Sequence, residues 1–304
     1  MRYLVKLSYL GRDFHGWQVQ PSDPSVQQAL EDALGILLRH PVPVTGAGRT
    51  DAGVNAVGYI AHFDAEEGLD EQRLVCKLNA ILPPAVAVLG IRPASPGFHA
   101  RFDATKREYT YFLHRVKDPF VESWSYLYTY PGLDFGAMNE AAACLKGQHD
   151  FRCFEKSGTD VKTSICTVNE AFWAAYTPTV SALGVAGAQK GVAGSQPKMT
   201  RSQPGKTGAQ PENAGTRPED AGPDWPYWYF RISADRFLRN MVRAVVGTLL
   251  EVGRGKRSAE DFRALILDAD PLRAREVMRS CAGESVPGHA LFLSGVEYQP
   301  LAGK

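Results

Sequence analysis

The chain has 304 residues, of which 44% are hydrophobic and 22% charged, a balance that excludes a disordered or fibrous protein and predicts a folded core. Its 34 lysines and arginines nearly balance 33 aspartates and glutamates, so a net charge of +1 excludes attraction of nucleic acid by overall charge. An RNA partner would instead need basic residues gathered in a local patch.

The N-terminus and the cysteines together predict a cytoplasmic protein. Lys6, Arg12 and Asp13 interrupt the first residues before an apolar stretch of signal-peptide length forms. No later run reaches the roughly 18 apolar residues of a membrane span. The five cysteines show no CxxC spacing, so we expect reduced thiols. The seven histidines lack HExxH or paired Cys/His spacing, and we therefore expect no metal site.

The elements expected in chain order mix strands with a few helices. Residues 2–9 alternate between apolar and polar side chains, as a half-buried strand requires. Ser25, followed by Gln28, is expected to cap an amphipathic helix. This mixture predicts an α+β fold. Further strands are expected at residues 57–63, 86–91, 107–114, 226–233 and 291–298, and helices near 71–80, 137–146, 235–252 and 258–267.

A tandem repeat of seven residues occupies residues 184–224, with units such as SQPKMTR, SQPGKTG and AQPENAG. Its prolines would break a helix and no apolar seam runs through the units, which argues against a coiled coil. The segment contains no aromatic residue, so we predict a disordered insertion at about residues 180–224. The flanks, residues 167–176 and 225–234, both have the pattern of strands, so the insertion is expected to project from a hairpin.

The segment GAGRTDAGVNA, residues 46–56, combines three glycines with an arginine and an aspartate. It matches neither a Walker A loop, which needs Gly-Lys-Ser/Thr, nor a Rossmann fingerprint, which needs glycine at the position of Asp51. Arg49 can hold the Asp51 carboxylate in its ionised form, the form that acts as nucleophile or base. For this loop taken alone, a turn capped by Asp51 beside a surface cation remains open.

Two further segments carry side chains suited to an RNA base and its phosphates. On the helix expected over residues 235–252, Arg236, Arg239 and Arg243 fall together away from the apolar stripe, as a basic patch or as an ordinary solvated face. Tyr109 alternates with its neighbours on an expected strand. Most rings there therefore pack in the core, and only one face can stack on a base.

Several blocks of the sequence, taken in order, resemble the tRNA pseudouridine synthase A family. The glycine-containing loop resembles the family signature GRTDAGVHA, and DFHGWQVQP before it is similar to xFxGWQxQP. GFHARFDATKREYTYFL, ADRFLRNMVRAVVGTLLEVGRGK and HALFLSGVEY follow in register. The resemblance covers residues 1 to about 176 and 225–298. One departure is Asn55, which replaces the family's usual histidine and cannot be protonated near neutral pH.

The resemblance implies a particular fold and reaction. The expected fold is two related α+β domains, each a mixed or antiparallel sheet with helices, flanking a central RNA-binding cleft. The domains would be residues 1–104, with the catalytic loop 46–56, and residues 105–300, interrupted by the repeat. The expected reaction isomerises uridine to pseudouridine at positions 38, 39 and 40 in the anticodon stem-loop of tRNA. A homodimer would carry it out, with no metal or other cofactor.

Carried over residue by residue, the resemblance assigns roles to the matched positions. It makes Asp51 the catalytic nucleophile or base and Arg243 the arginine that pairs with it. It makes Tyr109 the ring that stacks on the uracil. Arg49 becomes the cation that helps hold the target nucleotide out of its stack. The remaining substrate contacts are expected from Arg236 and Arg239.

Two other classes of function remain open at this point. A non-catalytic RNA-binding or RNA-folding protein would use the same basic residues, but binding to polyanionic RNA would not favour a carboxylate such as Asp51. A glycosidase or nucleosidase also places a carboxylate near a glycosidic carbon, but it normally needs a second carboxylic acid for the leaving group. Asp13 and Asp103 are the candidates for that second acid within the matched blocks.

Overall fold

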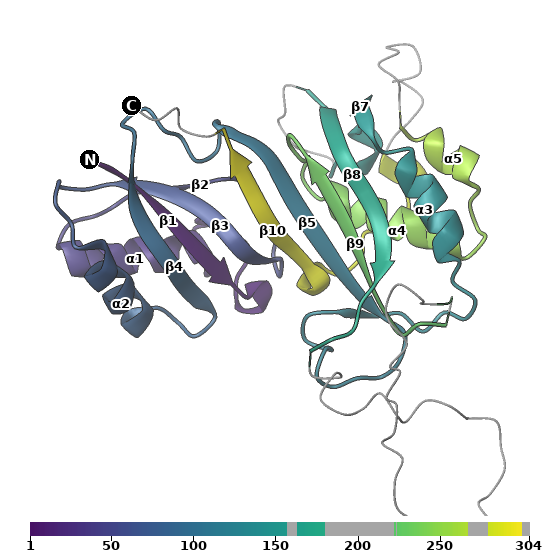
Figure 1. The fold of residues 1–304 in the computed structure, drawn as a ribbon, viewed down its shortest axis with the longest axis horizontal. Helices are drawn as coiled ribbons and strands as arrows, with labels where there is room; N and C mark the ends of the chain where they lie inside the picture. Colours follow the sequence, from purple (N-terminus) through teal and green to yellow (C-terminus); the bar gives the residue numbers. More distant parts are fainter. Residues whose placement is uncertain (157–162, 180–221, 223, 267–278, 300–304) are drawn as a thin grey trace, which may run out of the picture.

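The strands of the computed structural model form one continuous mixed sheet (Figure 1). Their order is β4-β1-β3-β10-β5-β9-β8-β7, with β2 beside β3 and β6 beside β5. The expected mixture of strands and helices in an α+β fold is confirmed. The insertion expected at about residues 180–224 lies almost wholly outside the described residues. The described parts of the chain are residues 1–156, 163–179, 222, 224–266 and 279–299.

The first half of the sheet is antiparallel, with β1 between β3 and β4. Its first helix begins at Ser25, whose hydroxyl accepts the N–H of Gln28 at 3.2 Å, as the sequence predicts. This half has two helices, and apolar residues of both pack beneath β1 in one hydrophobic cluster. The elements of this half are β1 (Arg2–Tyr9), α1 (Val26–Leu38), β2 (Val44–Gly46), β3 (Asn55–Asp64), α2 (Glu71–Ile81) and β4 (Val86–Ala94).

The second half of the sheet carries the remaining helices, and its strands β8 and β9 pair antiparallel. These two strands flank the tandem repeat, so the expected hairpin is confirmed. The elements of this half are β5 (Ala104–His114), β6 (Tyr126–Leu127), α3 (Phe135–Ala143), β7 (Gly147–Asp150), β8 (Ile165–Ala175), β9 (Tyr227–Ala234), α4 (Met241–Gly253), α5 (Ala259–Arg263) and β10 (Leu291–Tyr298).

The last strand, β10, joins the two halves. It pairs parallel with β3 through Phe292 and Leu293 and antiparallel with β5 along its length. Figure 1 shows it in yellow between β3 and β5. Leu291 and Leu293 point to the same face but belong to different hydrophobic clusters, and Tyr109 on β5 packs against both. The helices of both halves therefore cover one face of the sheet. The division into domains at residue 104 stays a prediction.

The long helix expected near the end of the chain begins only at Met241, so Arg236 and Arg239 precede it. Asn240, in front of the helix, has a φ of 66°, a left-handed conformation that an α-helix does not pass through. Of the three arginines, only Arg243 lies on α4. The common helical face expected for them is therefore wrong.

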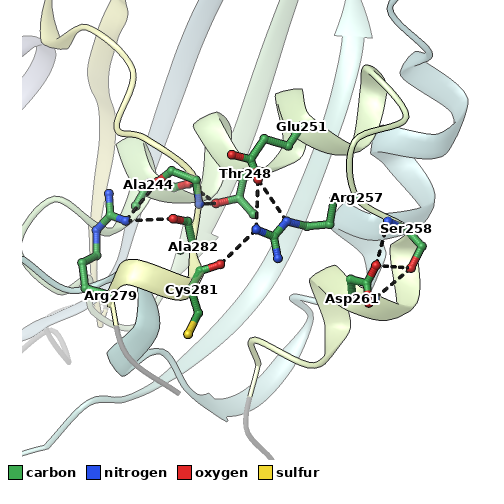
Figure 2. Close-up of polar contacts among 10 residues, drawn as sticks. Ala244, Thr248, Glu251, Arg257, Ser258, Asp261, Arg279, Cys281 and Ala282 are labelled. Carbon is green, nitrogen blue, oxygen red and sulfur yellow. Dashed lines mark hydrogen bonds and ion pairs between the residues drawn. The ribbon is translucent and has the colours of Figure 1, made fainter. Parts of the chain in front are cut away.

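A return segment, residues 279–290, is fastened to α4 by side-chain hydrogen bonds (Figure 2). The hydroxyl of Thr248 accepts the N–H of Gly283 at 2.9 Å. Arg257, just beyond the end of α4, donates to the carbonyl of Cys281 at 2.9 Å. These bonds hold the return segment along the helix before the chain enters β10.

The packing of the return segment against α4 can be tested at Gly247. A Cβ at this position would meet the carbonyl oxygen of Glu284 in the return segment. We expect Gly247→Ala to lower the free energy of unfolding by about 1–3 kcal/mol, because backbone must shift to make room. The matched control is Gly35→Ala in α1, where the nearest atom, the oxygen of His40, is 3.6 Å from the added Cβ.

The control should be neutral or stabilising by up to about 1 kcal/mol, because alanine favours a helix over glycine. Urea denaturation of both variants measures the difference. Equal stability of Gly247→Ala and Gly35→Ala would show that the return segment does not press on α4.

Candidate active site

The loop of residues 46–56 connects β2 to β3 and is held by the segment that follows β1. The N–H of Trp17 donates to the carbonyl of Thr50 at 3.3 Å. The N–H of Gly53 donates to the carbonyl of Phe14, also at 3.3 Å. The loop is thus fixed immediately before its aspartate and shortly after it.

Glycine is required on both sides of this contact. Gly16 has a φ of 96°, and a Cβ there would meet the carbonyl oxygen of Thr50. Gly53, within the loop, has a φ of 77°. Side chains are disfavoured in this left-handed region, and only glycine permits so close an approach of two backbones. The unusual backbone path expected from the glycines of the loop is therefore confirmed.

Asp51 lines a cavity of about 240 Å³, which we call the Asp51 cavity. The Asp51 side chain is 28% exposed, and its Oδ1 atom lies 3.8 Å from Nε of Arg239. Asp51 supplies the only carboxylate among the described residues that line the cavity, whereas three of them are lysine or arginine. The lining residues are His15, Gln20, Asp51, Ala52, Lys156, Arg239, Asn240 and Arg243.

The ion pair expected between Arg243 and Asp51 is made by Arg239 instead. Arg243 donates from Nε to the carbonyl of Val286 at 2.6 Å, and the N–H of Val286 donates back to the carbonyl of Arg243 at 3.2 Å. Arg243 is therefore anchored to the return segment while it lines the Asp51 cavity. The late start of α4 leaves Arg239 on a non-helical stretch that reaches the carboxylate.

The other two expected cations lie outside the Asp51 cavity. Arg49 is exposed and lines a second cavity of about 150 Å³, together with Arg101. Arg236 lines neither of these two cavities, and its N–H donates to the carboxylate of Asp235 at 2.7 Å. The structure thus gathers Arg239 and Arg243 around Asp51 but not the other two arginines.

Tyr109 packs between the two hydrophobic clusters, with its ring at right angles to that of Phe237 and 5.0 Å from it. Burial raises the pKa of the Tyr109 phenol well above its usual value. The negative charge of Asp51 raises this pKa further, and the positive charge of Arg107 opposes the rise. The Tyr109 ring therefore stays neutral at physiological pH and lies within the electrostatic reach of the carboxylate.

The two carboxylates considered for a glycosidase lie elsewhere. Asp13 is 3.5 Å from Nε of Arg12, and Asp103 accepts the N–H of His99 at 2.8 Å. Neither lines the Asp51 cavity. A second acid for the leaving group is thus missing from the described lining of this cavity, which weighs against the glycosidase alternative.

Other features bear on ligands and location. Among the described residues, no group of three histidine, cysteine or carboxylate side chains is arranged to hold a metal ion. Within the same residues, no helix has the length and apolar character needed to cross a membrane. All five cysteines are free thiols.

The comparisons with known proteins decide the family. A family model described as tRNA pseudouridine synthase matches residues 141–299. The tRNA pseudouridine synthase A of Parabacteroides distasonis is 45% identical over 299 residues, which cover 98% of this chain and 96% of that protein. The protein of the same name from Bacillus subtilis is 34% identical over 302 residues, covering 98% and 99%. The chain belongs to the tRNA pseudouridine synthase family.

Membership of this family makes the protein an isomerase that converts uridine to pseudouridine in tRNA. The resemblance found in the sequence is thereby confirmed. The family model covers the part of the chain that contains α4 and β10, and the relatives extend the match over the loop of residues 46–56.

Five residues of the described lining of the Asp51 cavity were not predicted as site residues, namely His15, Gln20, Ala52, Lys156 and Asn240. Gln20 stands near the end of the DFHGWQVQP block, and the match of this block to the family could have indicated it. The side-chain amide of Gln20 donates to the carbonyl of His15 at 2.8 Å. Lys156 stands in none of the matched blocks, so nothing in the local sequence marked it. Its N–H donates to the carbonyl of Arg239 at 3.0 Å, which brings it to the site.

Asn55, where this chain departs from the tRNA pseudouridine synthase A signature, bridges two segments and is 3% exposed. Its Oδ1 atom accepts the N–H of Gly11 at 2.8 Å, and its amide donates to the carbonyl of His289 at 2.6 Å. One acceptor and one donor are also what a neutral imidazole offers. The asparagine therefore provides the hydrogen-bonding capacity of an uncharged histidine.

This bridge predicts how substitutions at Asn55 behave. Asn55→Leu leaves a buried donor and a buried acceptor unpaired and should lower the free energy of unfolding by about 2 kcal/mol or more. Asn55→His should stay within about 1 kcal/mol of wild type at about pH 8, where the imidazole is neutral. Urea denaturation measures both, and a leucine variant as stable as wild type would contradict the bridge.

The histidine variant adds a test by pH. A protonated imidazole cannot accept the N–H of Gly11, so the folded state disfavours protonation and lowers the pKa of the introduced histidine. The stabilisation is then present above the unfolded-state value of about 6.5 and is lost as the pH falls below it. Wild type, with an amide at this position, should show no such loss from residue 55.

Proposed function

We propose that this chain isomerises uridine at positions 38, 39 and 40 in the anticodon stem-loop of tRNA, with Asp51 as its nucleophile or base. The observation that supports this role is the Asp51 cavity. The one carboxylate of its described lining, from the first half of the chain, lies beside Arg239 and shares the cavity with three cationic side chains from the second half, Lys156, Arg239 and Arg243. Such a site attracts a polyanion and still presents one ionised oxygen to the sugar or the base.

The reaction sets the requirements that the cavity has to meet. The bond from C1′ to N1 breaks, the uracil turns over, and a bond from C1′ to C5 forms; C5 loses a proton and N1 gains one. An ionised carboxylate serves either as the nucleophile at C1′ or as the group that attacks the ring. The ion pair with Arg239, at 3.8 Å, limits the rotation of the Asp51 side chain.

Tyr109 is proposed as the surface on which the uracil stacks. A neutral aromatic ring contributes about 1–3 kcal/mol to binding a stacked base, which offsets part of the few kcal/mol that extruding the nucleotide costs. Because burial raises the pKa of the Tyr109 phenol, the ring offers the uracil a neutral stacking surface. Arg49 is proposed to hold the nucleotide out of its stack, and Arg236 to contact phosphate.

The proposal extends to assembly and location. We infer a cytoplasmic homodimer whose subunits have two domains, residues 1–104 and 105–300, on either side of an RNA-binding cleft that contains the Asp51 cavity. The resemblance to the tRNA pseudouridine synthase A family supports the dimer and the cleft. Lining residues that come from both sides of residue 104 fit such a cleft. Free thiols fit a reducing compartment.

The central test maps pseudouridine in tRNA after incubation with the purified protein. Wild type should form it at positions 38, 39 and 40. Asp51→Asn should form none detectable and should keep a tRNA dissociation constant within about threefold of wild type, because a neutral amide keeps the shape but cannot act as nucleophile or base. The matched control is Asp103→Asn, which changes a carboxylate outside the cavity and should remain active.

Pseudouridine at other positions of the tRNA, with uridine unchanged at positions 38, 39 and 40, would reject the proposed specificity. Near-normal turnover by Asp51→Asn would reject the role of Asp51 but leave the specificity standing.

A second prediction separates the arginines. Arg239→Gln removes the ion pair of Asp51 and should slow single-turnover isomerisation by about 10-fold or more, with a smaller loss of affinity. Arg236→Gln, outside the cavity, should leave the rate unchanged and lower the log-log salt slope of tRNA binding by about one, because one phosphate contact is lost. Single-turnover kinetics and filter binding across a salt series measure both. An unchanged rate in Arg239→Gln would contradict the ion-pair role.

A further inference from the structure

Arg107 uses all the donors of its guanidinium on backbone carbonyls. Its Nε and Nη2 atoms donate to Ala47 at 3.2 and 2.9 Å, and Nη2 also donates to Arg101 at 2.6 Å. Its Nη1 atom donates to Asp235 at 2.8 Å and to Ala104 at 3.3 Å. The five N–H groups of one side chain thus hold three separate loops.

Two of these loops carry the members of the ion pair at the Asp51 cavity. Ala47 precedes Asp51 by four residues, and Asp235 precedes Arg239 by four residues. We propose that Arg107 is a positioning residue that sets the relative placement of Asp51 and Arg239 in the isomerisation. This inference rests on the proposed function, in which Asp51 carries out the chemistry.

The continuity of the sheet does not depend on this arginine. β10 already joins the two halves through its pairing with β3 and β5. Arg107 stands on β5, two residues before Tyr109 and therefore on the same face of the strand. What it adds is contact between the loop before β3 and the loop after β9, on the same face of the sheet as Tyr109. Those are the loops whose spacing determines the distance between the carboxylate and its cation.

The acceptors explain why the position needs arginine. All four are backbone carbonyls, whose directions are fixed by the loops, and the planar guanidinium meets them with five N–H groups. A lysine has three donors on one nitrogen and cannot reach all the carbonyls at once. Burial lowers the pKa of Arg107, yet the group remains charged at neutral pH and attracts the four carbonyl dipoles.

The test is Arg107→Lys in the full-length protein. This substitution keeps the positive charge and removes some of the hydrogen bonds to the backbone carbonyls of the loops. We expect the single-turnover rate to fall by about 10-fold, and by no more than in Arg239→Gln, because misplacing the pair of Asp51 and Arg239 costs no more than breaking it. The dissociation constant for tRNA should change by less than about threefold, since no phosphate contact is removed.

The control is Arg2→Lys. Arg2 also bridges segments, with Phe98 as a carbonyl acceptor at 2.7 Å and Asp64 as an ion-pair partner at 2.8 Å, but it does not line the Asp51 cavity. Its rate should stay within about twofold of wild type, because it positions neither Asp51 nor Arg239.

A double-mutant cycle distinguishes positioning from general support of the fold. In the Arg239→Gln background, Arg107→Lys should slow the reaction by less than about threefold, because the pair that Arg107 positions is already broken. Hydrogen exchange, which does not depend on activity, should become faster for peptides covering residues 46–51 and 235–239. The same loss of rate in both backgrounds, or unchanged exchange in these peptides, would overturn the proposal.

Wild type and Asp51→Asn are assayed beside these variants, so failures can be told apart. If wild type formed no pseudouridine, the proposed function would be rejected. The hydrogen-exchange result would still test whether Arg107 holds the two loops in place. If Arg107→Lys does not fold, Arg107→Gln takes its place in the cycle. Failure of both variants to fold would show that Arg107 supports the whole fold and would overturn the positioning role.

Discussion

The site depends on the pairing of β10 with two strands that are distant in sequence. β3 continues directly from the loop that carries Asp51, and β5 carries Tyr109. The two strands do not pair with each other; β10 lies between them and bonds to both. The last strand of the chain therefore determines the separation of the carboxylate and the aromatic ring, and it places two hydrophobic clusters side by side beneath one sheet.

The chain that leads into β10 ties the same elements together a second time. The return segment runs along α4, where Val286 holds Arg243, and then reaches the start of β3, where His289 bonds to Asn55. Arg107 adds a third tie, between the loop before β3 and the loop after β9. The cavity therefore lies between loops that are each bound at several points, which is the rigidity expected of a catalytic site. A chain with almost no net charge thus concentrates positive charge around one carboxylate.

Much of this could be predicted from local patterns. The observed bounds of β1 and β10 are the predicted ones, because alternation along a strand depends only on neighbouring residues. The cap at Ser25 is equally local. The short strands β2, β6 and β7 were missed, because so few residues carry no recognisable period. α4 was predicted to begin too early, since helical spacing before Asn240 gives no sign of its left-handed backbone.

The sequence by itself determined the longer strands, the capped helix, the glycine path of the loop and the resemblance that led to the family. These follow from contacts between near neighbours or from whole motifs. Only the tertiary structure decided that Arg239 reaches Asp51 while Arg243 is anchored to the return segment. It also decided that Arg107 spans loops far apart in the chain. The physical reason is that each of these contacts joins residues whose separation is fixed by β10 and by packing, not by their spacing in the sequence.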